Sequence, residues 1–187
     1  MKNKGILLLI MLLFIGLILS SCGNTGEGNG STGVGNTDAT QGNGIFQTDL
    51  KNIIEQIYAG TTGAELPETE YKDIKADNVE FYLGSKDFSN ITQAVASDPK
   101  LSTVPYSVCI LRVSNANQTE NMKNNIKSNI NLSKWICDRA DCVYINNCDN
   151  VIIVIMGKES TVKAIYASFQ KLAGTAAGKL LQKNIDE

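Results

Sequence analysis

The sequence predicts an α+β fold in which helices pack on an antiparallel or mixed sheet of about four strands. Two observations favour this class. Segments with the 3.6-residue apolar period of a helix alternate along the chain with short runs of β-branched residues. Near the C-terminal end, two such runs are separated only by turn-forming residues, which is typical of an antiparallel hairpin. Residues 45–187 have the usual size of one domain, so we expect a single globular unit there.

The first predicted helix begins after Thr48, whose side chain can cap its N-terminus. Its apolar residues have the spacing i, i+3, i+4 and i+7: Leu50, Ile53, Ile54 and Ile57. Gly60 stands where helices commonly end in a left-handed conformation. Residues 61–76 contain Pro67 and several acidic side chains without a clear period, so we expect mostly loop there, with about one helical turn.

Two further strands and a short helix are predicted in the middle of the chain. Residues 78–83 alternate between apolar and polar side chains, which predicts a half-buried strand that ends at Gly84. Residues 88–95 carry apolar side chains at helical spacing, so we expect a short helix that stops before Pro99. Residues 106–113 are rich in β-formers on both faces, which predicts a central strand.

A polar helix, a hairpin and a last helix complete the predicted fold. Asn117 and Glu120 have the spacing of a capping box. The stripe that follows is narrow and advances in steps of four: Met122, Ile126 and Ile130. Residues 142–145 and 151–156 predict the two strands of the hairpin. The last helix ends at Gly174, and its apolar positions are Val162, Ile165, Tyr166, Phe169 and Leu172.

Residues 1–21 are predicted to be a secretory signal peptide. Two lysines precede an apolar run over residues 6–19, and small residues follow it. As a helix this run would rise roughly 21 Å, which is short of a hydrocarbon core of about 30 Å. A permanent membrane-spanning helix is therefore the weaker interpretation.

The segment Leu19-Ser20-Ser21-Cys22 resembles the bacterial lipobox. The resemblance implies that a diacylglyceryl group is attached to Cys22 and that a peptidase cuts just before it. Two acyl chains suffice for stable attachment to a membrane. We therefore expect a lipid anchor at Cys22 and a location on the extracytoplasmic face of the cell membrane. The alternative is an ordinary secretory cleavage site followed by an unmodified cysteine.

Residues 22–44 are predicted to be a flexible linker behind the lipidated cysteine, because Gly, Asn and Thr dominate them and aromatic residues are absent. The whole chain has 17 basic and 19 acidic side chains, and its lysines and arginines form no cluster. Binding to nucleic acid needs such a cluster to neutralise phosphates. We therefore expect no nucleic-acid partner.

The chain contains no histidine. This removes the commonest general base and the commonest metal ligand, so we expect no metal, no cofactor and no histidine-dependent nucleophile. Ser-Lys chemistry and carboxylate pairs would remain for an enzyme. The nearest carboxylate pairs are Asp138 with Asp141 and Glu68 with Glu70, which we interpret as solvated loop charges.

Four cysteines remain when Cys22 is assigned to lipid: Cys109, Cys137, Cys142 and Cys148. Their oxidation state stays open, with free thiols favoured. A strand placed over residues 142–148 would hold its two cysteines too far apart for a disulfide. A Cys137–Cys142 bridge, or one that involves Cys109, is geometrically open. Trp135 is the one tryptophan. We expect it to cover the sheet or to serve as an exposed contact for a partner.

The distinctive segment of the chain is Lys134-Trp135-Ile136-Cys137, and four other segments accompany it: Tyr106-Ser107, Arg112-Val113, Asn129-Ile130-Asn131 and Asn150 to Met156. Together they resemble a family of Gram-positive bacterial lipoproteins that is known as a domain of unknown function. The resemblance covers under half of the chain. It implies a surface lipoprotein and carries over no catalytic residue.

These observations predict a lipid-anchored extracytoplasmic protein whose domain is a non-enzymatic binding or accessory module for an unknown protein or small molecule. One alternative is a hydrolase that uses Ser-Lys or carboxylate chemistry. Another is a thiol redox protein that uses Cys137 and Cys142.

Overall fold

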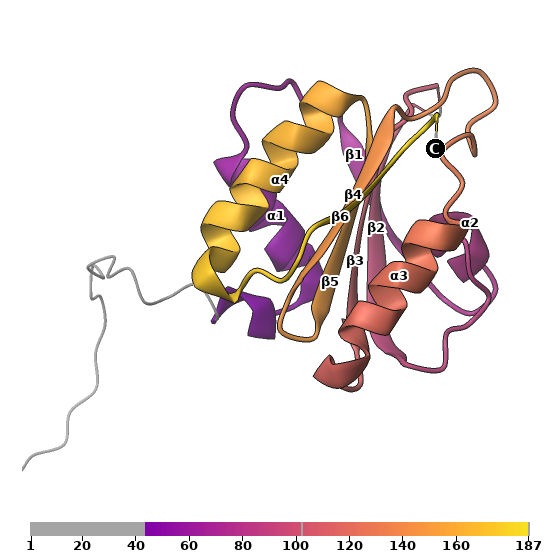
Figure 1. Ribbon diagram of the computed structural model, residues 1–187. Coiled ribbons are helices and arrows are strands. Elements are labelled where there is room, and N and C mark those ends of the chain that lie inside the picture. The colour runs from indigo at the N-terminus through magenta and orange to yellow at the C-terminus, as the bar shows by residue number, and fades with distance from the viewer. Residues whose placement is uncertain (1–43, 102, 187) are drawn as a thin grey trace, which may run out of the picture. The chain divides into compact units, whose positions relative to one another are not determined.

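The computed structural model describes residues 44–101 and 103–186. The predicted signal peptide, Cys22 and nearly all of the predicted linker lie outside the described residues. Within them, a single six-stranded sheet is antiparallel throughout, with the strand order β1-β2-β3-β5-β4-β6 (Figure 1). The predicted α+β class with an antiparallel sheet is confirmed, but the sheet has more strands than the four we expected.

The strands are short and the helices range from five to fifteen residues. The strands are β1 (Thr69–Asp73), β2 (Ile91–Pro99), β3 (Ser107–Val113), β4 (Cys142–Cys148), β5 (Val151–Gly157) and β6 (Leu181–Asn184). The helices are α1 (Leu50–Gly60), α2 (Val79–Leu83), α3 (Thr119–Asn129) and α4 (Glu159–Ala173), with single 3-10 turns at Ile45–Gln47, Ala116–Gln118 and Gly174–Ala176.

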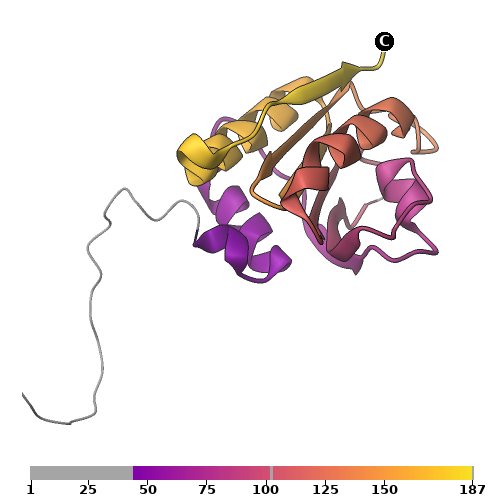
Figure 2. The ribbon, with the colours of Figure 1, turned by 60° about the horizontal axis from the view of Figure 1, so that its bottom comes forward.

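Helices cover both faces of the sheet, so the domain has three layers. Figures 1 and 2 show α1 and α4 on one face and α2 and α3 on the other. The α1 and α4 face buries Ile53, Ile153 and Phe169, and the opposite face buries Ile126 and Val154. Complete burial of each such side chain stabilises the fold by roughly 1.5–3 kcal/mol. The central strands β3 and β5 are buried on both faces, as the sequence predicted for residues 106–113 and 151–156.

The strand predicted over residues 78–83 is wrong, because the segment forms α2. Its buried residues are Val79, Tyr82 and Leu83, which have helical spacing, whereas Phe81 is 51% exposed. The predicted end at Gly84 is confirmed. Gly84 has a φ of 73°, and a Cβ there would collide with the backbone of Asn129, so both features require glycine.

The short helix predicted over residues 88–95 is also wrong, because Ile91–Pro99 forms β2. A bulge between Ile91 and Gln93 shifts the register of β2 against β3. The bulge places Ile91 in the core under α2 and α3, and Val95 in the core under α1 and α4. A regular strand would place these two residues, four apart, on the same face, so the inserted residue is what sends them to opposite faces.

Two edge strands were not predicted. β1 lies within the segment 61–76 that we expected to be mostly loop, and β6 follows the last helix. Both are polar and only partly buried. The backbone of β1 pairs with β2, and that of β6 pairs with β4. Because this pairing does not depend on apolar side chains, the sequence of the two strands shows little apolar pattern.

The predicted caps need three corrections. Asp49, and not Thr48, caps α1, since its Oδ1 accepts a hydrogen bond of 2.8 Å from the Lys51 backbone. Gly60 belongs to α1 and has no left-handed conformation. The capping box does not form, because α3 begins at Thr119 after a 3-10 turn. The hairpin of β4 and β5 and the last helix are confirmed, with Gly174 at a φ of 56°.

Candidate ligand site around Lys134

The predicted site residues do not meet in one place. Cys22 lies outside the described residues. Cys137 is exposed in the loop between α3 and β4, whereas Cys142 is buried at the start of β4. Both are free thiols in the structure, as are Cys109 and Cys148. The structure therefore does not join Cys137 to Cys142.

The buried thiols are poor candidates for redox chemistry. Burial raises the pKa of Cys142 to about 11, and the charges of Glu159 and Asp141 act in the same direction. Burial also raises the pKa of Cys109 and Cys148 to about 11. Thiol exchange requires the thiolate, so these environments disfavour it.

The carboxylate pairs are held by lysines at the surface. Lys158 Nζ lies 3.3 Å from Asp138 Oδ1 and 3.4 Å from Asp141 Oδ1. A backbone hydrogen bond from Arg139 lowers the pKa of Asp138, with further help from Lys158. The other two carboxylates form exposed ion pairs, Glu68 with Lys100 at 3.1 Å and Glu70 with Lys72 at 3.0 Å. The lowered pKa of Asp138 is the opposite of the raised pKa that a general acid needs.

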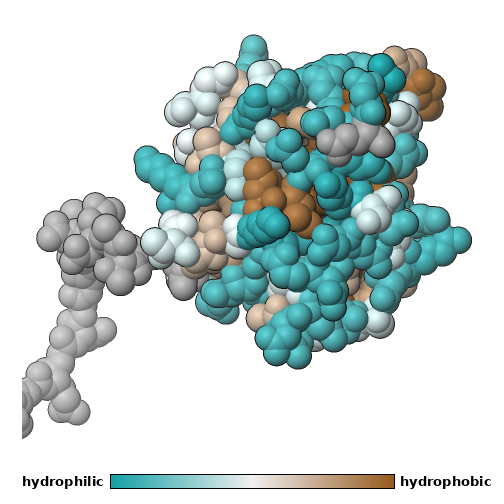
Figure 3. Space-filling model, viewed as in Figure 1, coloured by the Kyte–Doolittle hydropathy of each residue, from teal (hydrophilic) through white to brown (hydrophobic). Residues whose placement is uncertain are grey.

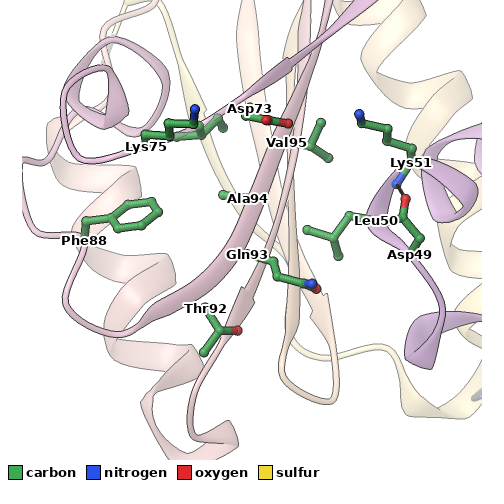
Figure 4. A pocket seen from close by; sticks show the side chains of 11 residues that line it. Asp49, Leu50, Lys51, Asp73, Lys75, Phe88, Thr92, Gln93, Ala94 and Val95 are labelled. Carbon is green, nitrogen blue, oxygen red and sulfur yellow. Dashed lines mark hydrogen bonds between the residues drawn. The ribbon is translucent and has the colours of Figure 1, made fainter.

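A pocket of about 380 Å³ lies beside the uncovered end of β2 (Figure 4). β1 pairs with Val95–Pro99, so within the described residues the first part of β2 has β3 as its only strand neighbour. Phe88 lines the pocket on one side of β2 and Leu50 on the other. The bulge at Thr92 interrupts this open edge, which is a common way of protecting a strand from further pairing.

The most unusual group in the domain is the ammonium of Lys134, in the loop between α3 and β4. Its Nζ lies 4.5 Å from the ring centroid of Phe81, 4.9 Å from that of Tyr82 and 5.0 Å from that of Trp135. We call these three rings the aromatic cage. The Nζ is shielded from solvent and has no hydrogen-bond partner among the described residues. Desolvation lowers the pKa of Lys134, with Cys109 and Asp98 opposing this effect.

A polar network lies against the sheet beneath the cage. Tyr82 donates its hydroxyl to Asp98 Oδ2 at 2.8 Å, and Ser107 Oγ donates to Asp98 Oδ1 at 2.7 Å. Burial raises the pKa of Tyr82, and the negative charge of Asp98 adds to the effect. Ser107 is 1% exposed and its hydroxyl is committed to Asp98. Ser107 and Lys134 therefore share a region of the domain without forming the hydrogen-bonded pair that Ser-Lys catalysis needs.

The cage borders a surface pocket of about 450 Å³ that both Phe81 and Lys134 line. The rest of its lining is polar and includes the carboxylates of Asp77 and Glu80. Asn129, the last residue of α3, and Asn131, in the loop that follows, also line it. The pocket therefore offers carboxylates and amides at its rim and an aromatic ring in its wall.

Trp135 lies in the loop between α3 and β4, next to Lys134. It is partly buried and packs against the core under α2 and α3. Its neighbour Ile136 is fully exposed, and Phe81 across the cage is half exposed. Figure 3 shows a mostly hydrophilic face with one group of hydrophobic atoms near its middle and another at the upper right, where Figure 1 places the loop between α3 and β4. The cage therefore has one half-exposed ring, and Ile136 adds an exposed apolar side chain next to Trp135.

Sequence reasoning identified Trp135 but missed Lys134, Phe81 and Tyr82. A lone lysine in a polar segment carries no signal of burial. Phe81 was assigned to the buried face of a strand, and helix α2 instead places it at the surface.

Comparisons of the chain with protein-family models, curated proteins and solved structures found no match. Within residues 44–101 and 103–186, no helix has the length and apolar character needed to cross a membrane.

Proposed function

We propose that this chain is a lipid-anchored protein on the extracytoplasmic face of a bacterial cell membrane, and that its folded domain is a non-enzymatic binding module. The lipobox resemblance around Cys22 supports the anchor. The buried Lys134 ammonium beside the aromatic cage carries the binding role. A buried cation without a hydrogen bond costs stability, and ionisable groups in such environments cluster at functional sites.

The side chains around the cage suit a binding surface. Phe81 is 51% exposed and Ile136 is fully exposed, while Trp135 lies between buried and exposed. Aromatic residues are enriched at the apolar centre of interfaces, and tryptophan and tyrosine are frequent among the energetically dominant residues there. The hydroxyl of Ser107 is hydrogen-bonded to Asp98, and the raised pKa values of the buried cysteines keep their thiols protonated. The region therefore supports binding better than catalysis.

The anchor is tested by intact-mass analysis of the native protein and by Cys22→Ala. We expect a mass that corresponds to a diacylated Cys22 without residues 1–21. We expect the Cys22→Ala variant to be absent from the membrane fraction and the control variant Cys137→Ala to be present in it. An unmodified N-terminus or an uncleaved leader would contradict the anchor.

The binding surface is tested by placing a photo-crosslinking amino acid at Ile136 in living cells. The control position is Asn52, which is exposed on α1 and therefore on the other face of the sheet. We expect a specific adduct from position 136 that Trp135→Ala weakens. Equal labelling from both positions, or labelling that does not respond to Trp135→Ala, would contradict the proposal.

A further inference from the structure

The aromatic cage holds a cation that does not suit it. A lysine ammonium has three N–H donors, and here none of them meets an acceptor in the described part of the chain. The cage supplies instead three π faces at 4.5–5.0 Å from the Nζ. Attraction between a cation and an aromatic face needs no hydrogen bond. The cage therefore matches a cation that has no N–H groups better than it matches a lysine.

The neighbouring pocket has the charge that such a cation requires. Asp77 and Glu80 line it, and Lys134 is its only basic residue. Glu80 lies 3.5 Å from Lys86, but both side chains are well exposed, so this ion pair is weak. If Lys134 turns out of the cage, the pocket and cage together present two carboxylates, amide groups and aromatic rings.

We propose that Phe81, Tyr82 and Trp135 form a binding site for a small quaternary ammonium compound, and that the side chain of Lys134 occupies this site when the compound is absent. This inference rests on the proposed binding role and names the ligand class. The cage would hold the quaternary ammonium group, and the rest of the ligand would lie in the pocket beside Asn129 and Asn131.

Displacement of Lys134 is physically reasonable. Lys134 lies in the irregular loop between α3 and β4, where no helix or strand fixes its backbone. Moving its ammonium into water restores three hydrogen bonds that the cage does not provide. The quaternary ammonium group that replaces it has no hydrogen bonds to lose. The exchange therefore favours the ligand more than the similar charges of the two groups suggest.

Trp135 gives a direct readout, because it is the one tryptophan of the chain. The full chain, purified in a non-ionic detergent, is titrated with tetramethylammonium chloride and with choline while tryptophan emission is followed. The matched control ligand is 3,3-dimethylbutan-1-ol, which has the shape of choline but no charge. We expect saturable changes with the two cations and none with the neutral alcohol.

Variants separate the contribution of the aromatic cage from that of the Lys134 side chain that occupies it. Lys134→Ala empties the cage, so choline should bind more tightly, by about tenfold if Lys134 leaves the cage in roughly one molecule in ten. Phe81→Leu removes one exposed ring and should weaken binding by about two- to thirtyfold. Lys171→Ala, at an exposed position on α4, is the control and should bind like the wild type.

The inference fails if neither the wild type nor Lys134→Ala shows saturable binding of either cation. It also fails if the neutral alcohol binds as well as choline, or if Lys134→Ala binds choline no more tightly than Lys171→Ala does. The crosslinking experiment at Ile136 is independent of these titrations. Trp135-dependent crosslinking without cation binding would therefore leave the proposed function standing and overturn the ligand class alone.

Discussion

The Nζ of Lys123 donates a hydrogen bond of 2.8 Å to Asn147 Oδ1, and the Lys123 side chain has no exposed surface. The same ammonium donates to the Lys179 carbonyl at 2.8 Å and pairs with Glu120 at 2.6 Å. These contacts connect α3 to β4 and to the segment before β6. Lys123 thus differs from Lys134, since its buried charge is fully satisfied and its role is structural.

Replacement of Lys123 by methionine should destabilise the domain by about 3 kcal/mol, because it leaves Asn147 Oδ1 and the Lys179 carbonyl without their donor. Urea unfolding followed by circular dichroism measures the change. Lys163→Met is the control, since Lys163 pairs with Glu159 at 2.6 Å on the exposed face of α4 and should change stability little. Similar effects of the two substitutions would contradict the structural role of Lys123.

Gly60→Ala should destabilise the domain although alanine is the better helix former. A Cβ at residue 60 would lie 2.5 Å from Ser168 Oγ, which donates a hydrogen bond of 2.6 Å to the Ile57 carbonyl. We expect a loss of about 1–3 kcal/mol from this overpacking. The double variant Gly60→Ala/Ser168→Ala removes the clash and should recover part of the loss. A double-mutant cycle with no coupling between the two positions would be inconsistent with this contact.

The elements that the sequence predicted correctly carry their own apolar pattern. α1 and α4 have helical stripes, and β5 is apolar throughout, so local periodicity suffices for them. The errors occur in segments whose secondary structure is determined by tertiary contacts. The bulge in β2 places Ile91 and Val95 on opposite buried faces, so the apolar residues of this strand do not alternate with polar ones. Helix α2 has too few residues for its period to be distinguished from that of a strand. β1 and β6 exist through backbone pairing at the sheet edges, which leaves almost no trace in side-chain hydropathy.

The same limit applies to the candidate site. Trp135 could be identified because tryptophan is rare in this chain. Its association with Phe81 and Tyr82 depends on α2 lying beside the loop that follows α3, which no local pattern specifies. The burial of Lys134 is a consequence of that packing.

Tyr82→Phe should separate the two roles of Tyr82. It keeps the ring of the cage but removes the hydroxyl that donates to Asp98 Oδ2 at 2.8 Å. Without this donor, the same oxygen keeps the ion pair with Lys72, whose Nζ lies 3.9 Å away. We expect a loss of about 1–2 kcal/mol in the free energy of unfolding and no loss of choline affinity. Urea unfolding and the Trp135 titration measure the two effects, and a large loss of choline affinity would assign the hydroxyl to the site.

The lowered pKa of Lys134 should appear in the pH dependence of stability. Burial disfavours the ammonium in the folded state, so the folded-state pKa lies below the ordinary value of 10.5. Between the two values the unfolded chain binds more protons than the folded domain, and stability therefore rises with pH. Lys134→Met lacks this group and should not show the rise.

The quantity to measure is the difference in free energy of unfolding between the wild type and Lys134→Met, from neutral pH to about pH 10. Above that pH, tyrosines of the unfolded chain begin to ionise. The burial of Tyr58 and Tyr106 raises their pKa, which lowers stability at high pH in both proteins and cancels in the difference. We expect the difference to move in favour of the wild type as the pH rises. A constant difference would mean that Lys134 titrates normally, and a change in the opposite direction would mean that the cage and Asp98 stabilise its ammonium more than burial destabilises it.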